Sequence, residues 1–302
     1  MAAKKTIKAE DINPVEGFEN TKPQKAKGKR TVKKEGEVKS TVEKTVKKIA
    51  SKISALTAED NKNTRLTFEV RFSTEYGQNL FVVGDHELLG NDDLEFALPL
   101  QYLNDKAWSA TIELHEGNTP RVINYRYFVK NVDGSIIEES LANKSIDLSA
   151  SAGKNIYVSD FWSFSGFPAG LFETKPFLIL LNNAGAAEPT KKTKNSTHVF
   201  TVKAPVVSND QVVCMLGDDK RLGSWEVKKA LKLYPVGNGN WQIELDLSKS
   251  VFPIHYKFGL LNTKTKKPLI LEGYENRCCA LPAIKDGKVF INEGLINLAE
   301  NA

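Results

Sequence analysis

Residues 82–92 read VVGDHELLGND, and residues 215–225 read MLGDDKRLGSW. Two glycines and a leucine stand at the same offsets in both stretches, and the agreement continues downstream. The recurring groups are Trp108 and Trp241, Tyr125-Arg126-Tyr127 and Tyr256-Lys257-Phe258, and Asn143-Lys144 and Asn276-Arg277. The two stretches are 133 residues apart, whereas solenoid units have only about 20–50 residues. The chain therefore contains a duplicated domain, and differences between the copies point to function.

Around these markers, short runs of alternating apolar and polar residues are separated by Gly, Asn and Asp. Examples are LTFEVRF at 66–72 and WSATIEL at 108–114, with IHYKFGLL at 254–261 in the second copy. A period of two is typical of β-strands. The sequence predicts an all-β protein with two immunoglobulin-like antiparallel β-sandwich domains in tandem, over residues 61–165 and 197–302.

The segment between the two predicted domains, residues 166–196, is less regular. Its apolar run Phe177–Leu181 predicts one more strand, and the residues after it read as a polar linker.

The positive charge of the chain is concentrated at its N-terminus. The 302 residues have a formal net charge of +5, but residues 1–60 carry +6 and the remainder carries −1. The tail is rich in Lys, Glu and Pro and poor in aromatic residues, which predicts disorder. Because the folded part is close to neutral, we predict no nucleic-acid binding.

Within this disordered basic tail, residues 37–56 predict a short amphipathic helix. Its apolar residues recur at spacings of three and four; they are Val38, Val42, Val46, Ile49, Ile53 and Leu56. Such a helix can dock a protein partner or lie on a membrane surface, or it can be a solvated helix in a linker. The sequence leaves these alternatives open.

Several classes of protein do not fit this sequence. There is no run of about 18 apolar residues for a membrane span and no apolar stretch of signal-peptide type at the N-terminus. Cys214, Cys278 and Cys279 form neither a disulfide framework nor a zinc motif. We expect a cytoplasmic protein with reduced thiols and without metal or cofactor.

The ordered markers resemble the family 20 starch-binding modules, over about residues 64–160 and 197–297. The resemblance rests on a Gly, a Leu-Gly pair, an Ala-Leu pair, a Trp, a Tyr-Lys-Tyr-like strand, a Glu and an Asn, in this order in both copies. It implies carbohydrate-binding β-sandwiches that attach to α-1,4-glucans. Two such modules in tandem are similar to the N-terminal region of disproportionating 4-α-glucanotransferases.

The resemblance also implies site residues. In the family, one site uses a Trp after the Leu-Gly turn, a Lys in the Tyr-Lys-Tyr strand, and a second Trp before the Glu. The second copy has Trp225, Lys257, Glu272 and Asn276 at matching positions, with Leu271 in place of the second Trp. The first copy has Asp92 and Arg126 instead, with Ile137 at the position of the second Trp, followed by Glu138, and with Asn143 further on. This predicts that the first copy has lost the site.

A second family site uses two tyrosines, and here the first copy is the one that matches. Tyr76 and Tyr102 stand at these positions, whereas the second copy has Asn209 and Pro235. The two copies are therefore expected to bind glucan through different sites, one in each domain.

Such a site needs no catalytic group, because an aromatic ring stacks on the apolar face of a sugar and polar side chains bond its hydroxyls. The sequence contains no GxSxG, HExxH, P-loop or supported GxGxxG motif. The prediction is a non-catalytic binder of starch, glycogen or maltooligosaccharides. Two alternatives remain: the N-terminal part of a 4-α-glucanotransferase, or a protein-interaction scaffold with decayed sugar sites.

Overall fold

A computed structural model describes residues 63–139, 144–149, 153–163, 176–177, 195–265, 268–273 and 275–298. Outside the described residues lie the predicted basic tail with its helix at 37–56, most of the connecting segment 166–196, residues 178–181 of the strand expected at 177–181, and Asn143. The described part is nearly all β, as predicted, with four short 3-10 turns.

Both copies contain the same series of strands, and we call them the first and second repeat. The first repeat comprises β1 (Thr64–Arg71), β2 (Asn79–Gly84), η1 (Glu87–Leu89), η2 (Leu94–Phe96), β3 (Leu98–Pro99), β4 (Gln101–Asn104), β5 (Ala107–Leu114), β6 (Val122–Lys130), β7 (Ile136–Glu138), β8 (Lys144–Asp147) and β9 (Asn155–Phe161). The second comprises β10 (His198–Lys203), β11 (Gln211–Gly217), η3 (Lys220–Leu222), η4 (Val227–Lys229), β12 (Leu231–Lys232), β13 (Tyr234–Gly237), β14 (Asn240–Leu245), β15 (Ile254–Asn262), β16 (Pro268–Leu271), β17 (Arg277–Cys279) and β18 (Gly287–Leu295).

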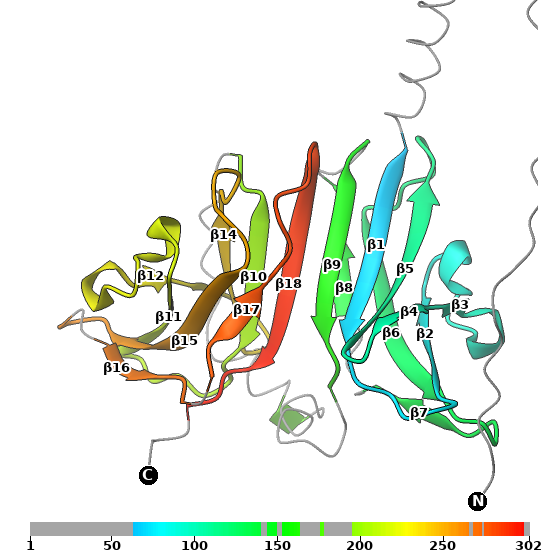
Figure 1. Ribbon diagram of the computed structural model, residues 1–302, viewed down its shortest axis with the longest axis horizontal. Helices are drawn as coiled ribbons and strands as arrows, with labels where there is room; N and C mark the ends of the chain where they lie inside the picture. The colour runs from blue at the N-terminus through cyan, green and yellow to red at the C-terminus, as the bar shows by residue number, and fades with distance from the viewer. Residues whose placement is uncertain are drawn as a thin grey trace, which may run out of the picture. The chain divides into compact units, whose positions relative to one another are not determined.

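The strands form one large shared sheet and two smaller sheets. The shared sheet has eight strands in the order β13-β14-β10-β18-β9-β1-β5-β4, and β9 runs parallel to β18 at its centre (Figure 1). Two five-stranded sheets complete the repeats, β12-β11-β15-β16 with β17, and β3-β2-β6-β7 with β8. The expectation of two separate sandwiches therefore needs correction. Pairing β9 with β18 satisfies backbone groups that would be exposed on the edge strand of each repeat.

The register at the junction of β9 and β18, which we call the seam, exchanges side chains between the repeats. Because side chains alternate along a strand, paired residues share one face of the sheet. Phe290 of the second repeat pairs with Val158 and packs against the hydrophobic core of the first. Tyr157 of the first repeat pairs with Val289 and packs against the core of the second. The two cores thus lie on opposite faces of the shared sheet.

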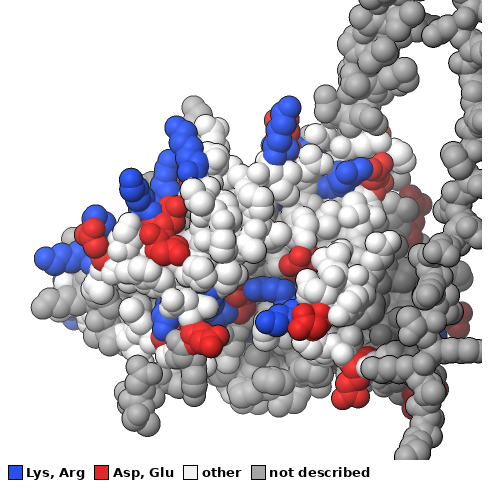
Figure 2. Space-filling model, viewed as in Figure 1, with Lys and Arg blue, Asp and Glu red and all other residues white. Residues whose placement is uncertain are grey.

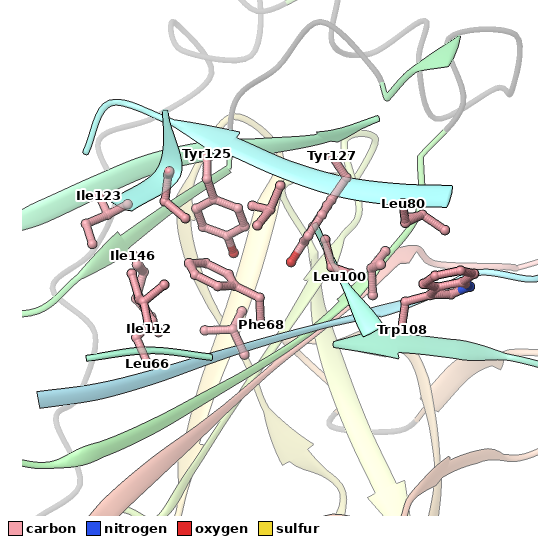
Figure 3. Packing of buried hydrophobic residues seen from close by; sticks show 14 of the residues in the cluster. Leu66, Phe68, Leu80, Leu100, Trp108, Ile112, Ile123, Tyr125, Tyr127 and Ile146 are labelled. Atoms are coloured by element: carbon pink, nitrogen blue, oxygen red, sulfur yellow. The ribbon is translucent and has the colours of Figure 1, made fainter. Parts of the chain in front are cut away.

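Each repeat has its own hydrophobic core, and the aromatic markers of the sequence belong to it. In the first repeat, Phe68 of β1 meets the edge of Tyr125 from β6 with ring centroids 4.9 Å apart (Figure 3). Trp108 and Trp162 are buried. Trp241 is only half-buried, and its indole N–H donates to the Ala204 carbonyl at 3.1 Å.

The described residues show little that would support other classes of function. Their helices include none long and apolar enough to cross a membrane. Cys214, Cys278 and Cys279 are free thiols. Within the described ranges, His, Cys, Asp and Glu form no group of three or more that could hold a metal ion.

His198 makes the stability of the second repeat dependent on pH. It is buried between Phe200 and Phe252, and its Nε2 lies 3.0 Å from the Leu281 carbonyl. Burial lowers the pKa of His198, although the bond to Leu281 acts in the opposite direction. The unfolded chain therefore takes up a proton at a higher pH than the folded chain, so stability is lost as the pH falls below about 6.5.

We expect His198→Gln to reduce this acid sensitivity, lowering the change in Tm between pH 7.5 and pH 5.5 by about 2–4 °C. Thermal unfolding followed by circular dichroism measures it, with the exposed His115→Gln as control. An unchanged pH dependence in His198→Gln would contradict the assignment.

Candidate functional site

The repeated Gly-Leu-Gly stretch forms a loop that folds back onto its own strand. Gly217 ends β11, and a Cβ atom there would lie 2.5 Å from the His255 carbonyl oxygen, so only glycine fits. The chain then makes the turn η3, buries Leu222, and passes Gly223 at φ +87°. The backbone N–H of Trp225 donates to the Gly217 carbonyl at 2.7 Å and closes the loop.

Trp225 stands at the tip of this loop in an unfavourable backbone conformation. Its φ is +60°, and that of Ser224 is +50°. The first repeat has the same geometry at Asn91 and Asp92, with φ of 50° and 65°, but Asn and Asp tolerate the left-handed region whereas a bulky residue is strained there. The second repeat thus carries a Trp where the backbone favours a small polar residue. Its side chain is 38% exposed.

Lys257 and Leu271 lie on the sheet next to this loop. Lys257 on β15 pairs with Leu216 on β11, directly before Gly217, and its Nζ donates to the Glu272 carbonyl at 3.1 Å. Leu271 on β16 pairs with Gly259, and its Cδ2 lies 2.6 Å from the position that a Cβ atom added to Gly259 would occupy. Leu271 therefore fills the space that the missing side chain of Gly259 leaves open.

The prediction that the Glu272 carboxylate contacts sugar is not supported by its surroundings. Glu272 is only 6% exposed. Its Oε2 accepts from the Phe258 N–H at 2.9 Å, and its Oε1 accepts from the Asn297 N–H at 3.0 Å and from Arg277 Nη2 at 2.6 Å. These bonds hold β15, β17 and the C-terminal segment together. Asn276, the other predicted polar residue, is exposed directly before Arg277.

The equivalent place in the first repeat is occupied by an ion-pair cluster. Arg126 Nη1 donates to Asp92 Oδ1 at 3.1 Å, and Arg126 Nε lies 3.6 Å from Glu138 Oε2. Asp92 and Arg126 are the counterparts of Trp225 and Lys257. The first repeat thus has one arginine paired with two carboxylates where the second has a ring, a lysine and a leucine.

The structural alignment of the two repeats at Glu138 differs by one residue from the alignment expected from the sequence. The Glu139 N–H donates to the Tyr127 carbonyl at 3.0 Å, as the Glu272 N–H donates to the Phe258 carbonyl at 2.9 Å. Glu139 is therefore the counterpart of Glu272, and Glu138 that of Leu271. Assigning Ile137 to the second Trp position was wrong. The offset of 133 residues that relates Trp108 to Trp241 and Asn143 to Asn276 would have identified Glu139.

Tyr76 and Tyr102 present exposed rings at one end of the first repeat. Tyr76 lies fully exposed in the turn after β1, and Tyr102 on β4 is 59% exposed with its ring edge-on to Trp108 at 5.4 Å. Because Arg71 at the end of β1 pairs with Ala107 at the start of β5, the turn with Tyr76 and the β4–β5 turn lie at the same end of the sheet.

The turn that carries Tyr76 is fastened to its neighbour. Gln78 Nε2 donates to Asn131 Oδ1 at 2.9 Å, and a Cβ on Gly77 would lie 2.3 Å from Val132 Cγ2. The exposed ring thus stands on a turn with defined contacts.

The charges on one face of the molecule are of mixed sign. On the face shown in Figure 2, Lys and Arg side chains are interspersed with Asp and Glu. What the two candidate sites offer is exposed aromatic rings with amide, hydroxyl and ammonium groups nearby, which is a chemistry of binding.

A family described as the starch binding domain matches residues 63–156 and 196–290, together more than half of the chain. Among curated proteins, 4-alpha-glucanotransferase DPE2 of Oryza sativa subsp. japonica is 24% identical over 207 residues, 64% of this chain and 22% of the relative. Glucoamylase P of Amorphotheca resinae is 33% identical over 102 residues, 32% of this chain and 16% of the relative. The chain thus spans about a fifth or less of the length of these relatives.

Among solved structures, the family 20 CBM of the maltotetraose-forming amylase from Pseudomonas saccharophila STB07 is similar, with 16% identity and a TM-score of 0.27. It covers 31% of this chain and 97% of that one. The family 15 glucoamylase from Hypocrea jecorina has 29% identity and a TM-score of 0.31, over 34% of this chain and 17% of that one.

Proposed function

Since the chain belongs to the starch-binding domain family over both matched regions, we propose that it binds α-1,4-glucans at two unlike sites and performs no catalysis with these residues. Trp225 with Lys257 and Asn276 forms the site of the second repeat. Tyr76 and Tyr102 form that of the first. The ligand class is starch, glycogen or the maltooligosaccharides derived from them.

The observation that carries this proposal is the conformation of Trp225. A Trp at φ +60° costs of order 1–3 kcal/mol relative to a relaxed residue. The first repeat forms the same loop with Asp92, so the fold does not require an aromatic ring there. The ring is partly exposed, and stacking on the apolar face of a sugar offsets this cost.

The roles of the polar residues follow from their positions. The Lys257 ammonium is anchored by the Glu272 carbonyl beside the Trp225 loop, and ammonium groups can donate to sugar hydroxyls. Asn276 is exposed and can both donate and accept. Glu272 acts indirectly, since it holds the strands on which Lys257 and Leu271 stand.

The relationship to DPE2 supports a proposal about context. We propose that the two repeats serve as the glucan-attachment part of a 4-α-glucanotransferase-like system in the cytoplasm. The catalytic activity of such enzymes is not assigned to the residues of this chain. The full chain can be expressed and assayed for glucan binding and for transfer between maltooligosaccharides. The proposal expects binding without transfer.

The first-repeat site is tested by two substitutions. Tyr76→Ala and Tyr102→Ala are each expected to weaken retardation of the full chain in native gels containing amylopectin, because each removes an exposed ring worth about 1 kcal/mol. Leu103→Ala is the control, as Leu103 is the exposed neighbour of Tyr102 on the same strand. If both tyrosine variants migrate like the unsubstituted chain in amylopectin, the first repeat has no site at these rings.

A further inference from the structure

Two buried carboxylates at the seam occupy equivalent positions in the two repeats. Asp160 of β9 and Glu293 of β18 are 0% and 4% exposed. Asp160 accepts from the hydroxyls of Tyr125 and Tyr127 at 2.9 and 2.8 Å, and Glu293 accepts from the Tyr256 hydroxyl at 2.6 Å. Each carboxylate thus fixes the tyrosines of its own repeat.

Each carboxylate also takes a donor from the other repeat. Asn292 Nδ2 donates to Asp160 Oδ1 at 2.6 Å. In the other direction, Arg71 Nη1 donates to Glu293 Oε1 at 3.0 Å, and Arg71 Nη2 donates to the Asn292 carbonyl at 2.6 Å. Arg71 belongs to β1, so the second repeat receives a partly buried positive charge from the first.

The contacts of Glu293 continue to the candidate glucan site. Arg277 Nη1 donates to Glu293 Oε2 at 2.9 Å, while its Nε and Nη2 bond both carboxylate oxygens of Glu272. The Glu272 carbonyl in turn accepts from Lys257, and Leu271 is its neighbour in sequence. One chain of bonds therefore runs from Arg71 through Glu293, Arg277 and Glu272 to Lys257.

The two buried carboxylates in this chain of bonds are matched by two guanidinium groups only if Arg71 is included. Glu272 and Glu293 supply two negative charges, and Arg71 and Arg277 two positive ones. Burial alone would raise the pKa of Glu293, but Arg71 and Arg277 lower it below the usual glutamate value. Without Arg71, two buried carboxylates would compete for the single guanidinium of Arg277, and an uncompensated buried charge is costly.

The first repeat is built differently at the equivalent place. Its counterpart of Arg277 is Lys144, whose ammonium contacts Glu139. A guanidinium has five donors in a rigid fork and can bridge two carboxylates, whereas an ammonium acts as a compact point charge. The repeat that keeps the Trp-Lys site is thus the one that carries the bridging arginine.

We propose that Arg71 of the first repeat is a positioning residue for the glucan site of the second repeat. Arg71 balances the charge of Glu293, so Arg277 remains available to bind the Glu272 carboxylate. Glu272, held in this way, fixes the backbone carbonyl that anchors Lys257. It also fixes the end of the strand that carries Leu271. The second repeat consequently binds glucan at full affinity only when β1 is in place beside it. This inference rests on the glucan-binding function proposed above.

The test measures affinity at one site in the full chain. Titration with maltoheptaose is followed by the indole N–H signal of Trp225 in nitrogen-15 NMR spectra, identified by its loss in Trp225→Phe. We expect Arg71→Gln to raise the dissociation constant about threefold to tenfold, in line with coupling through packed networks. Arg65→Gln is the matched control, because Arg65 lies on the same strand but pairs with Glu113 at the exposed surface.

A double variant separates positioning from general damage to the seam. Arg71→Gln with Glu293→Gln removes one charge of each sign and leaves Arg277 and Glu272 paired, so the dissociation constant should return to within about twofold of the unsubstituted chain. If Arg71→Gln alone precipitates, recovery of soluble, binding-competent protein in the double variant supports the proposal.

Three results would overturn it. The first is unchanged affinity in Arg71→Gln, and the second is a double variant that is no better than Arg71→Gln. The third is a Trp225 signal that does not respond to maltoheptaose in the unsubstituted chain. That third result removes the proposed glucan site as well, whereas the first two leave it intact.

Discussion

Replacing Trp225 with alanine is expected to weaken maltoheptaose binding to the second repeat at least about tenfold. An exposed indole buries a large apolar area when it stacks on a sugar ring, and Leu271 offers no second ring to compensate. A tenfold loss corresponds to about 1.4 kcal/mol. Isothermal titration calorimetry of the full chain with maltoheptaose measures it.

The same position allows a sharper version of this experiment. Trp225→Asn should lose binding equally, but it should also raise the free energy of unfolding by about 1 kcal/mol, because Asn accepts the left-handed conformation that strains Trp. A variant that is more stable and does not bind cannot be explained as misfolded. Val227→Ala, an exposed apolar change in the same loop, serves as control. Normal binding by Trp225→Asn would show that the ring is not the contact.

The strands could be predicted from the sequence because their apolar residues alternate over several residues. LTFEVRF became β1 with Leu66, Phe68 and Val70 buried on one face. The repeated glycines and leucines likewise marked real constraints, since Gly217 approaches the His255 carbonyl and Leu222 is buried under the loop. These are local requirements, and a sequence records them locally.

The shared sheet could not be predicted in the same way. An edge strand and a central strand have the same alternation, so nothing in β9 or β18 states that their outer edges pair with each other. Tyr157 and Phe290 read as ordinary strand aromatics, although each packs into the core of the other repeat. The partners that Asp160 and Glu293 take from the other repeat cannot be predicted either, because they are more than 100 positions away in the sequence.

The sequence indicated the residue types of the candidate sites but not the contacts that these residues make. Trp225 and Tyr76 are exposed, as binding rings must be, and their types were informative by themselves. The sequence could not show that Glu272 is buried and bonded to Phe258, Arg277 and Asn297, because an acid beside a site can equally well be its scaffold. The ion-pair cluster has a sequence signature, because Asp92, Arg126 and Glu138 are all charged whereas only Lys257 is charged among their three counterparts. The one-residue error in the expected alignment assigned Glu138 to the wrong counterpart.

Glu272→Gln is expected to lower the free energy of unfolding by about 3 kcal/mol, the largest effect on stability that we predict. The substitution removes the charge that faces Arg277 in a buried setting and replaces one acceptor oxygen by a donor amide. The Phe258 and Asn297 N–H groups then compete for the remaining oxygen. Breaking a buried ion pair from one side costs about 3–5 kcal/mol. Urea unfolding of the full chain, followed by circular dichroism, measures it.

Glu138→Gln is the matched control. The alignment expected from the sequence pairs Glu138 with Glu272, whereas the backbone hydrogen bonds show that Glu139 is the counterpart of Glu272. Glu138 is exposed and its pairing with Arg126 is worth less than about 1 kcal/mol. A large loss in Glu272→Gln beside a small one in Glu138→Gln supports Glu272 as scaffold and the corrected alignment. If Glu272→Gln instead keeps its stability and loses only glucan affinity, its carboxylate contacts sugar directly, and the internal bonds described here do not hold the site.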